Sequence, residues 1–104
     1  MSRLILSPAA RDDLDAIHSH IVADNPDAAD RVLNSAFDTF EMLTRHPEIG
    51  RARTFSKPRL QGLRSIGVRA YPNYVIFYRV RQTTVEIIRV LHGAPDFDGL
   101  FGGE

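Results

Sequence analysis

The sequence predicts an α+β fold in which an N-terminal strand and an antiparallel two-helix hairpin pack on a mostly antiparallel β-sheet. Three observations lead to this prediction: a short apolar segment at residues 3–6, two helix-start signals in the first half, and runs of β-branched and aromatic residues in the second half. With 104 residues, the chain is long enough for one hydrophobic core and too short for two ordinary domains. We therefore expect a single domain over residues 1–104.

The first helix is predicted to begin at Ser7-Pro8, directly after the strand candidate Arg3 to Leu6. A serine hydroxyl caps free backbone N–H groups, and proline already has a helical φ. An apolar stripe follows at spacings of four, three and four residues, formed by Ala10, Leu14, Ile17 and Ile21. Asp12, Asp13 and Asp15 are assigned to the first turns, where the helix dipole favours anions. Because neighbouring side chains on a helix diverge by about 100°, these acids predict no metal site.

The second helix is predicted to begin at Asn25-Pro26, which repeats the pairing of a cap residue with proline. The short connection predicts an antiparallel hairpin. A broad apolar stripe is formed by Ala29, Val32, Leu33, Ala36, Phe37, Phe40 and Leu43. The helix should end near His46, since the residue before Pro47 is disfavoured in a helix.

The second half is predicted to form the sheet. Residues 49–62 are expected to be an irregular connector with one short edge strand, and residues 63–70 alternate loosely. Tyr71-Pro72-Asn73 is predicted as a turn, followed by strands at Tyr74 to Arg81 and Thr84 to Leu91.

A turn centred on Gln82-Thr83 would give paired residue numbers that sum to 165. This register places Arg79 opposite Glu86 as a cross-strand ion pair. The same face is then expected to hold Val75, Phe77, Ile88, Val90 and His92, and the other face Tyr74, Ile76, Tyr78, Val80, Val85, Ile87, Arg89 and Leu91. Because both faces are substantially apolar, we expect the helices to cover one and a partner to cover the other.

Charge and composition argue against several classes of function. Residues 1–50 hold four Arg against nine acids, or −5, whereas residues 51–104 hold nine Arg or Lys against four acids, or +5. A neutral total lacks the basic excess of a dedicated nucleic-acid binder, so we expect no direct nucleic-acid binding. The chain has no cysteine, no membrane-length apolar run and no phosphate-binding glycine pattern. We expect a cytoplasmic protein without a cofactor or a metal.

Three segments resemble the RelE/ParE superfamily of toxins from bacterial type II toxin–antitoxin systems. They are Leu6-Ser7-Pro8-Ala9-Ala10, the strand Tyr74-Val75-Ile76-Phe77-Tyr78-Arg79, and the closing Arg89-Val90-Leu91-His92-Gly93. The resemblance spans nearly the whole chain. It implies a plasmid-stabilisation type of system, in which a ParD-like antitoxin with an acidic, amphipathic C-terminal segment folds along a groove of the toxin.

Within this superfamily, RelE-like members cleave messenger RNA on the ribosome, and ParE-like members bind and poison DNA gyrase. By alignment, two arginines of the ribonuclease type fall on Val75 and Pro95, and neither residue replaces a guanidinium. The Tyr-x-Ile-Phe-Tyr-Arg and Leu-His-Gly patterns look more like the ParE-like branch. Its usual arginine before the closing aspartate is absent, because Ala94-Pro95-Asp96 stands there. The resemblance therefore implies a gyrase inhibitor.

The candidate binding residues are Arg64, Arg69, Tyr74, Tyr78, Arg79, Arg89 and His92. Arginine and tyrosine contribute large contact energies when an interface desolvates them. Each also has a structural alternative: Tyr78 in the core, Arg79 paired with Glu86, and Arg89 stacked on the sheet. No catalytic residue is expected for a gyrase inhibitor. The alternative as a ribosome-dependent endoribonuclease would use His92 as acid or base with Arg64 or Arg69 holding phosphate. A third alternative is a non-toxic module that binds only the antitoxin.

Overall fold

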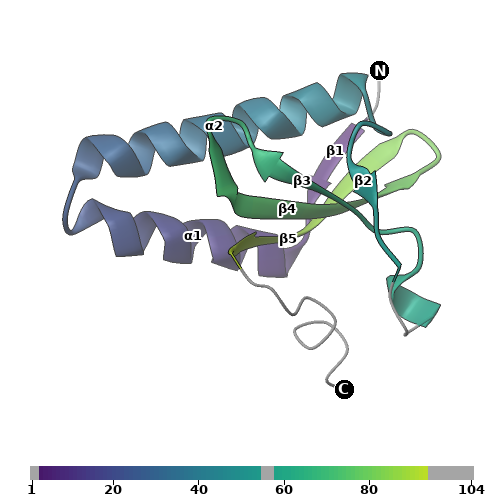
Figure 1. The fold of residues 1–104 in the computed structure, drawn as a ribbon, viewed down its shortest axis with the longest axis horizontal. Coiled ribbons are helices and arrows are strands. Elements are labelled where there is room, and N and C mark those ends of the chain that lie inside the picture. Colours follow the sequence, from purple (N-terminus) through teal and green to yellow (C-terminus); the bar gives the residue numbers. More distant parts are fainter. Residues whose placement is uncertain (1–2, 55–57, 94–104) are drawn as a thin grey trace.

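Residues 3–54 and 58–93, the part of the chain that the computed structural model describes, form a helical layer on a β-sheet (Figure 1). In chain order the elements are β1 (Arg3–Leu6), α1 (Pro8–Val22), α2 (Pro26–Arg45), β2 (Arg51–Ala52), the 3₁₀ helix η1 (Pro58–Leu60), β3 (Arg64–Val68), β4 (Tyr71–Arg81) and β5 (Thr84–His92). The two helices run antiparallel and extend beyond the sheet at the end where they connect (Figure 1). The predicted α+β class is confirmed.

Both helices begin as predicted. The Ser7 hydroxyl oxygen accepts a hydrogen bond from the Ala10 N–H at 3.0 Å, and the Asn25 side-chain oxygen accepts one from the Ala28 N–H at 3.0 Å. In each case proline occupies the first helical position. α2 ends at Arg45, and His46 leaves the helical conformation directly before Pro47.

The sheet has the strand order β1-β5-β4-β3-β2, so that β1 and β2 are its edges. β1 runs parallel to β5, and the other pairs are antiparallel. The parallel pair is possible because α1 and α2 carry the chain across one face of the sheet between its first strand and its later ones. β1 therefore presents one side to β5 and leaves its outer edge unpaired by any described strand.

The predicted turn at Tyr71-Pro72-Asn73 is wrong, because these residues begin β4. The chain turns two residues earlier, where Ala70 has a positive φ of 70°. The pairing of β3 with β4 shifts between Gly67 and Val68, opposite the proline. Proline has no N–H for the ladder, so it is tolerated at such an irregularity.

The predicted register of the last hairpin is correct near its turn and wrong beyond Tyr78. Arg79 pairs with Glu86 and Tyr78 with Ile87, but beyond Ile88 a β-bulge moves the pairing by one residue, so that Phe77 lies opposite Arg89. Val90 consequently packs with the helix-side core, and Leu91 packs with the outer cluster. The predicted faces of Val90, His92 and Leu91 are therefore wrong, since one extra residue reverses the alternation.

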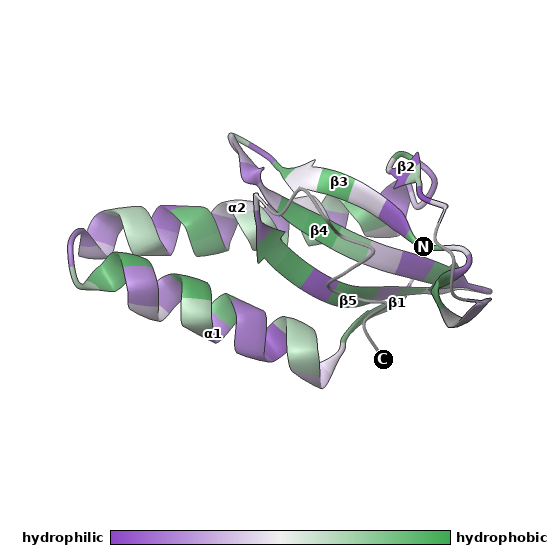
Figure 2. Cartoon of the chain, turned by 60° about the horizontal axis from the view of Figure 1, so that its bottom comes forward, coloured by the Kyte–Doolittle hydropathy of each residue, from purple (hydrophilic) through white to green (hydrophobic). Residues whose placement is uncertain are grey.

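Two apolar clusters lie on the two faces of the sheet. The larger is between the sheet and the helices and includes Phe40, Leu43, Ile76, Tyr78 and Ile87. The smaller is on the opposite face, called here the outer face, where Leu60, Leu63 and Phe77 are buried. Figure 2 shows the hydrophobic stretches of β4 and β5 that contribute to these clusters. No helix in the described residues is long and apolar enough to cross a membrane.

Candidate functional site

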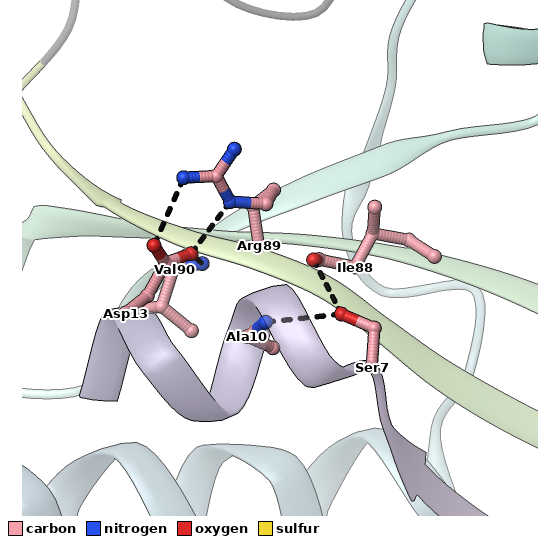
Figure 3. Close-up of polar contacts among 6 residues, drawn as sticks. All are labelled: Ser7, Ala10, Asp13, Ile88, Arg89 and Val90. Atoms are coloured by element: carbon pink, nitrogen blue, oxygen red, sulfur yellow. Dashed lines mark hydrogen bonds and ion pairs between the residues drawn. The ribbon is translucent and has the colours of Figure 1, made fainter. Parts of the chain in front are cut away.

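An ionic clamp joins the first helix to the last strand (Figure 3). The Asp13 carboxylate accepts hydrogen bonds from Arg89 Nε at 2.7 Å, from Arg89 Nη2 at 2.9 Å and from the Val90 N–H at 2.9 Å. The hydrogen bond to Asp13 raises the pKa of Arg89 above its ordinary value, against the opposing effect of burial. The Ser7 hydroxyl adds a second tie by donating to the Ile88 carbonyl at 2.8 Å.

The sequence reasoning did not find the role of Asp13. Its predicted role is that of an anion near the helix N-terminus, yet its side chain is 13% exposed and accepts hydrogen bonds from β5. The available signal was its position three residues after Ala10 and one before Leu14, on the border of the buried stripe. An acid at such a position requires a donor from the packed element, and Arg89 supplies it.

A small cleft lies beside the clamp, where β4 and β5 meet α1. The rings of Tyr74 and His92 lie 4.7 Å apart between their centroids. Together with Ala16, Ile17 and His20 they line a cavity of about 260 Å³. Two of the predicted contact residues, Tyr74 and His92, are thus brought together at one end of the sheet.

Two other candidates, Arg64 and Tyr78, hold a loop instead. Arg64 Nη1 donates to the carbonyls of Glu48 at 3.2 Å and Gly50 at 2.8 Å. The Tyr78 hydroxyl donates to the Pro47 carbonyl and accepts from the Gly50 N–H, both at 2.8 Å. Tyr78 is 0% exposed, and burial raises the pKa of its hydroxyl. The predicted use of Tyr78 as an anchor for a partner is therefore corrected: its side chain is in the core.

The remaining arginines differ in their surroundings. Arg69 is exposed at the turn between β3 and β4, where its backbone N–H donates to the buried Thr39 hydroxyl at 3.0 Å. Arg79 lies on the outer face directly opposite Glu86, as predicted. No ion pair joins these two side chains in the described part of the chain, so the predicted ion pair is wrong although the pairing is right.

The ribonuclease alternative would place Arg64 or Arg69 beside His92, and Arg64 lies far from His92. His92 pairs with Tyr74 and Arg64 pairs with Tyr78, on opposite sides of β4. Four residues separate the two tyrosines, or about 13 Å along a strand. Two strand spacings of about 4.8 Å add to this separation. The Arg64 guanidinium is in addition committed to two backbone carbonyls. The Ala94-Pro95-Asp96 corner lies outside the described residues.

An apolar groove runs along the free edge of the sheet, between β1 and the helical hairpin. We call it the β1-edge groove; it has a volume of about 490 Å³ and is lined by Leu6, Arg11, Leu14, Asp15, Leu33 and Phe37. Phe37 is 47% exposed and Leu4, on the same face of β1 as Leu6, is 38% exposed. Apolar side chains that are this exposed beside an unpaired strand edge are typical of a protein-binding site.

The fold is that of a small α+β protein with a helical hairpin on a mostly antiparallel sheet, consistent with the expected RelE/ParE fold. Residues 4–97 match the family model described as the ParE toxin of the type II toxin–antitoxin system parDE. The chain therefore belongs to the ParE toxin family.

A solved structure agrees with this fold. A chain described as "Chromosomal ParDE TA system from P. aeruginosa" matches with a TM-score of 0.73 and 23% sequence identity, covering 90% of this chain and 98% of that chain. At this identity the likeness supports the fold alone. No protein with a curated description matches the sequence.

Proposed function

We propose that this ParE-family toxin binds DNA gyrase, inhibits its supercoiling reaction, and is neutralised when a ParD-like antitoxin occupies the β1-edge groove. The family membership supports the class of system, because the matching family is the toxin of a toxin–antitoxin pair. The β1-edge groove is the observation that supports the docking position.

The groove suits an amphipathic segment. Leu33 and Phe37 are separated by one helical turn on α2, and they face Leu6 and Leu14 across the groove. A partner helix would insert apolar side chains at spacings of three and four residues into such a groove. Arg11 and Asp15, which carry opposite charges, both line the groove. We therefore expect apolar contact to provide most of the affinity at this position.

Inhibition by binding fits the geometry better than catalysis does. Phosphodiester cleavage needs an acid or base and cationic groups around one phosphate. The separation of His92 from Arg64 along β4 and across the sheet argues against one phosphate held between these two groups. We therefore propose that the toxin acts through surface contacts with gyrase and not through catalysis.

Two assays with purified toxin test whether gyrase or the ribosome is the target. Supercoiling of relaxed plasmid by purified gyrase should fall as toxin is added, while ribosomes programmed with a message should show no toxin-dependent cuts. Codon-aligned cuts that vanish in His92→Ala would favour the endoribonuclease. Absence of growth arrest when the toxin is expressed alone would favour the non-toxic module.

A matched pair of variants tests the antitoxin site. Phe37→Glu places a charge in the groove, whereas Ile49→Glu changes a similarly exposed apolar residue, 55% exposed, outside it. With the product of the adjacent antitoxin gene as the probe, Phe37→Glu should weaken binding by at least about 30-fold, as for a hot-spot residue. Ile49→Glu should bind normally. Equal binding by both variants would remove the groove from the proposal.

A further inference from the structure

Three arginines gather on the outer face of the sheet near the turn between β4 and β5. Arg3 on β1 and Arg81 on β4 both pair with Thr84 of β5, one from each side. Arg79 lies two residues before Arg81, so its side chain is on the same face. Strand spacing puts the Cα atoms of Arg3 and Arg81 about 10 Å apart, and those of Arg79 and Arg81 about 7 Å apart. We call this group the arginine patch.

The arginines of the patch are not neutralised within the described residues. The buried Nε of Arg79 has no hydrogen-bond partner. No ion pair involving the side chains of Arg3, Arg79 or Arg81 is found in residues 3–54 and 58–93. Glu86, which pairs with Arg79, contributes one negative charge against the three arginines, so the patch retains an excess of positive charge. The guanidinium of Arg79 therefore has no partner at its Nε in the part of the protein that the structure describes, which is costly for a buried donor.

Apolar surface adjoins the patch. Ile5 pairs with Glu86 on the same face and is 45% exposed. Half-buried Ile88 packs against the outer cluster around Phe77. The patch is on the face of the sheet opposite the helices, whereas the β1-edge groove is on the helix side. The two surfaces can therefore serve two different partners.

We infer that the arginine patch, with Ile5 beside it, is the surface that contacts gyrase, and that it binds a protein segment carrying carboxylate and apolar side chains. This inference rests on the proposed function. A carboxylate would pair with the guanidinium groups of the patch, because arginine binds carboxylates through paired N–H donors. Exposed Ile5 lies beside the arginines, and an apolar side chain of a protein segment would cover it, which a phosphate backbone does not offer.

Single charge changes test the inference. Arg79→Gln and Arg81→Gln each remove one positive charge from the patch, and Arg45→Gln removes one from the end of α2 as the matched control, where Arg45 pairs with Glu41. Gyrase supercoiling is measured for all three, with thermal unfolding to verify folding. Arg79→Gln should raise the toxin concentration for half-inhibition about tenfold or more, and the exposed Arg81→Gln about threefold. Arg45→Gln should match the unaltered toxin.

The outcomes separate the inference from the proposed function. If the unaltered toxin does not inhibit gyrase, the proposed function fails. If it inhibits and both patch variants inhibit equally well, the patch inference alone fails. Folded patch variants that inhibit normally but lose antitoxin binding would assign the patch to the antitoxin and overturn the inference. Binding of the unaltered toxin to a duplex oligonucleotide without gyrase, lost in both patch variants, would also overturn it in favour of nucleic acid.

Discussion

Replacing Asp13 tests whether the clamp between α1 and β5 stabilises the fold. In Asp13→Ala the Val90 N–H loses its acceptor, which costs about 1–3 kcal/mol for a buried group. The Arg89 side chain is 32% exposed and the Asp13 side chain 13%. The pair is thus intermediate between an exposed and a buried ion pair, so its loss adds about 1–2 kcal/mol. We expect Asp13→Ala to lower the free energy of unfolding by about 2–5 kcal/mol.

Urea denaturation measures this loss. A chain of this size has a total stability of about 5–15 kcal/mol, so the change is a large fraction of it. With a slope of about 1–2 kcal/mol per molar urea, the midpoint should fall by about 2 M. Asp13→Asn keeps an oxygen that can accept from Val90 but loses the charge, and should cost about 1–2 kcal/mol.

Two controls make the test specific. Asp12→Ala changes an adjacent exposed acid and should alter stability by no more than about 0.5 kcal/mol. A double-mutant cycle with Arg89→Met should give a coupling free energy of about 1–2 kcal/mol. If Asp13→Ala is no more destabilising than Asp12→Ala, the assignment of the clamp as a structural tie is refuted.

Three further outcomes are expected around the loop held by Tyr78. Gly50→Ala should destabilise the protein by about 2–4 kcal/mol, because a Cβ there would collide with the Tyr78 hydroxyl and ring. An unchanged melting temperature would contradict this. Tyr78→Phe should cost about 1–3 kcal/mol in urea denaturation, since the buried Gly50 N–H loses its acceptor, whereas Tyr74→Phe should cost less. Because burial raises the pKa of Tyr78 above 10.0, the unfolded state loses the proton first, so stability should fall as pH rises past about 10. This fall should be smaller in Tyr78→Phe, and equal slopes of stability against pH in the two proteins would contradict the assignment.

Features encoded by neighbouring residues could be predicted from the sequence. The pairs Ser7-Pro8 and Asn25-Pro26 start both helices, because a cap and a preset φ act within one turn. The turn at Gln82-Thr83 set the register of the last hairpin near its tip. The family resemblance rested on such local segments, and the family model confirms it.

The candidate site was less predictable, because contacts across long sequence separations decide it. Arg64 and Tyr78 looked available for a partner, but each holds the loop at Gly50. Whether the remaining candidates contact gyrase stays a prediction. The β1-edge groove was not assigned to particular residues beforehand, since it forms only where β1, α1 and α2 meet.

The sequence by itself determined the order of the elements, the starts of the helices and the toxin family. These features depend on capping, periodicity and turn chemistry, which involve residues close together in the sequence. Only the tertiary structure decided the bulge at Ile88, the pairing of Asp13 with Arg89 and the face on which each arginine lies. The physical reason is twofold. One extra residue in a strand moves every later side chain to the opposite face of the sheet. A buried charge must pair with a group that the fold brings close to it, however distant that group is in the sequence.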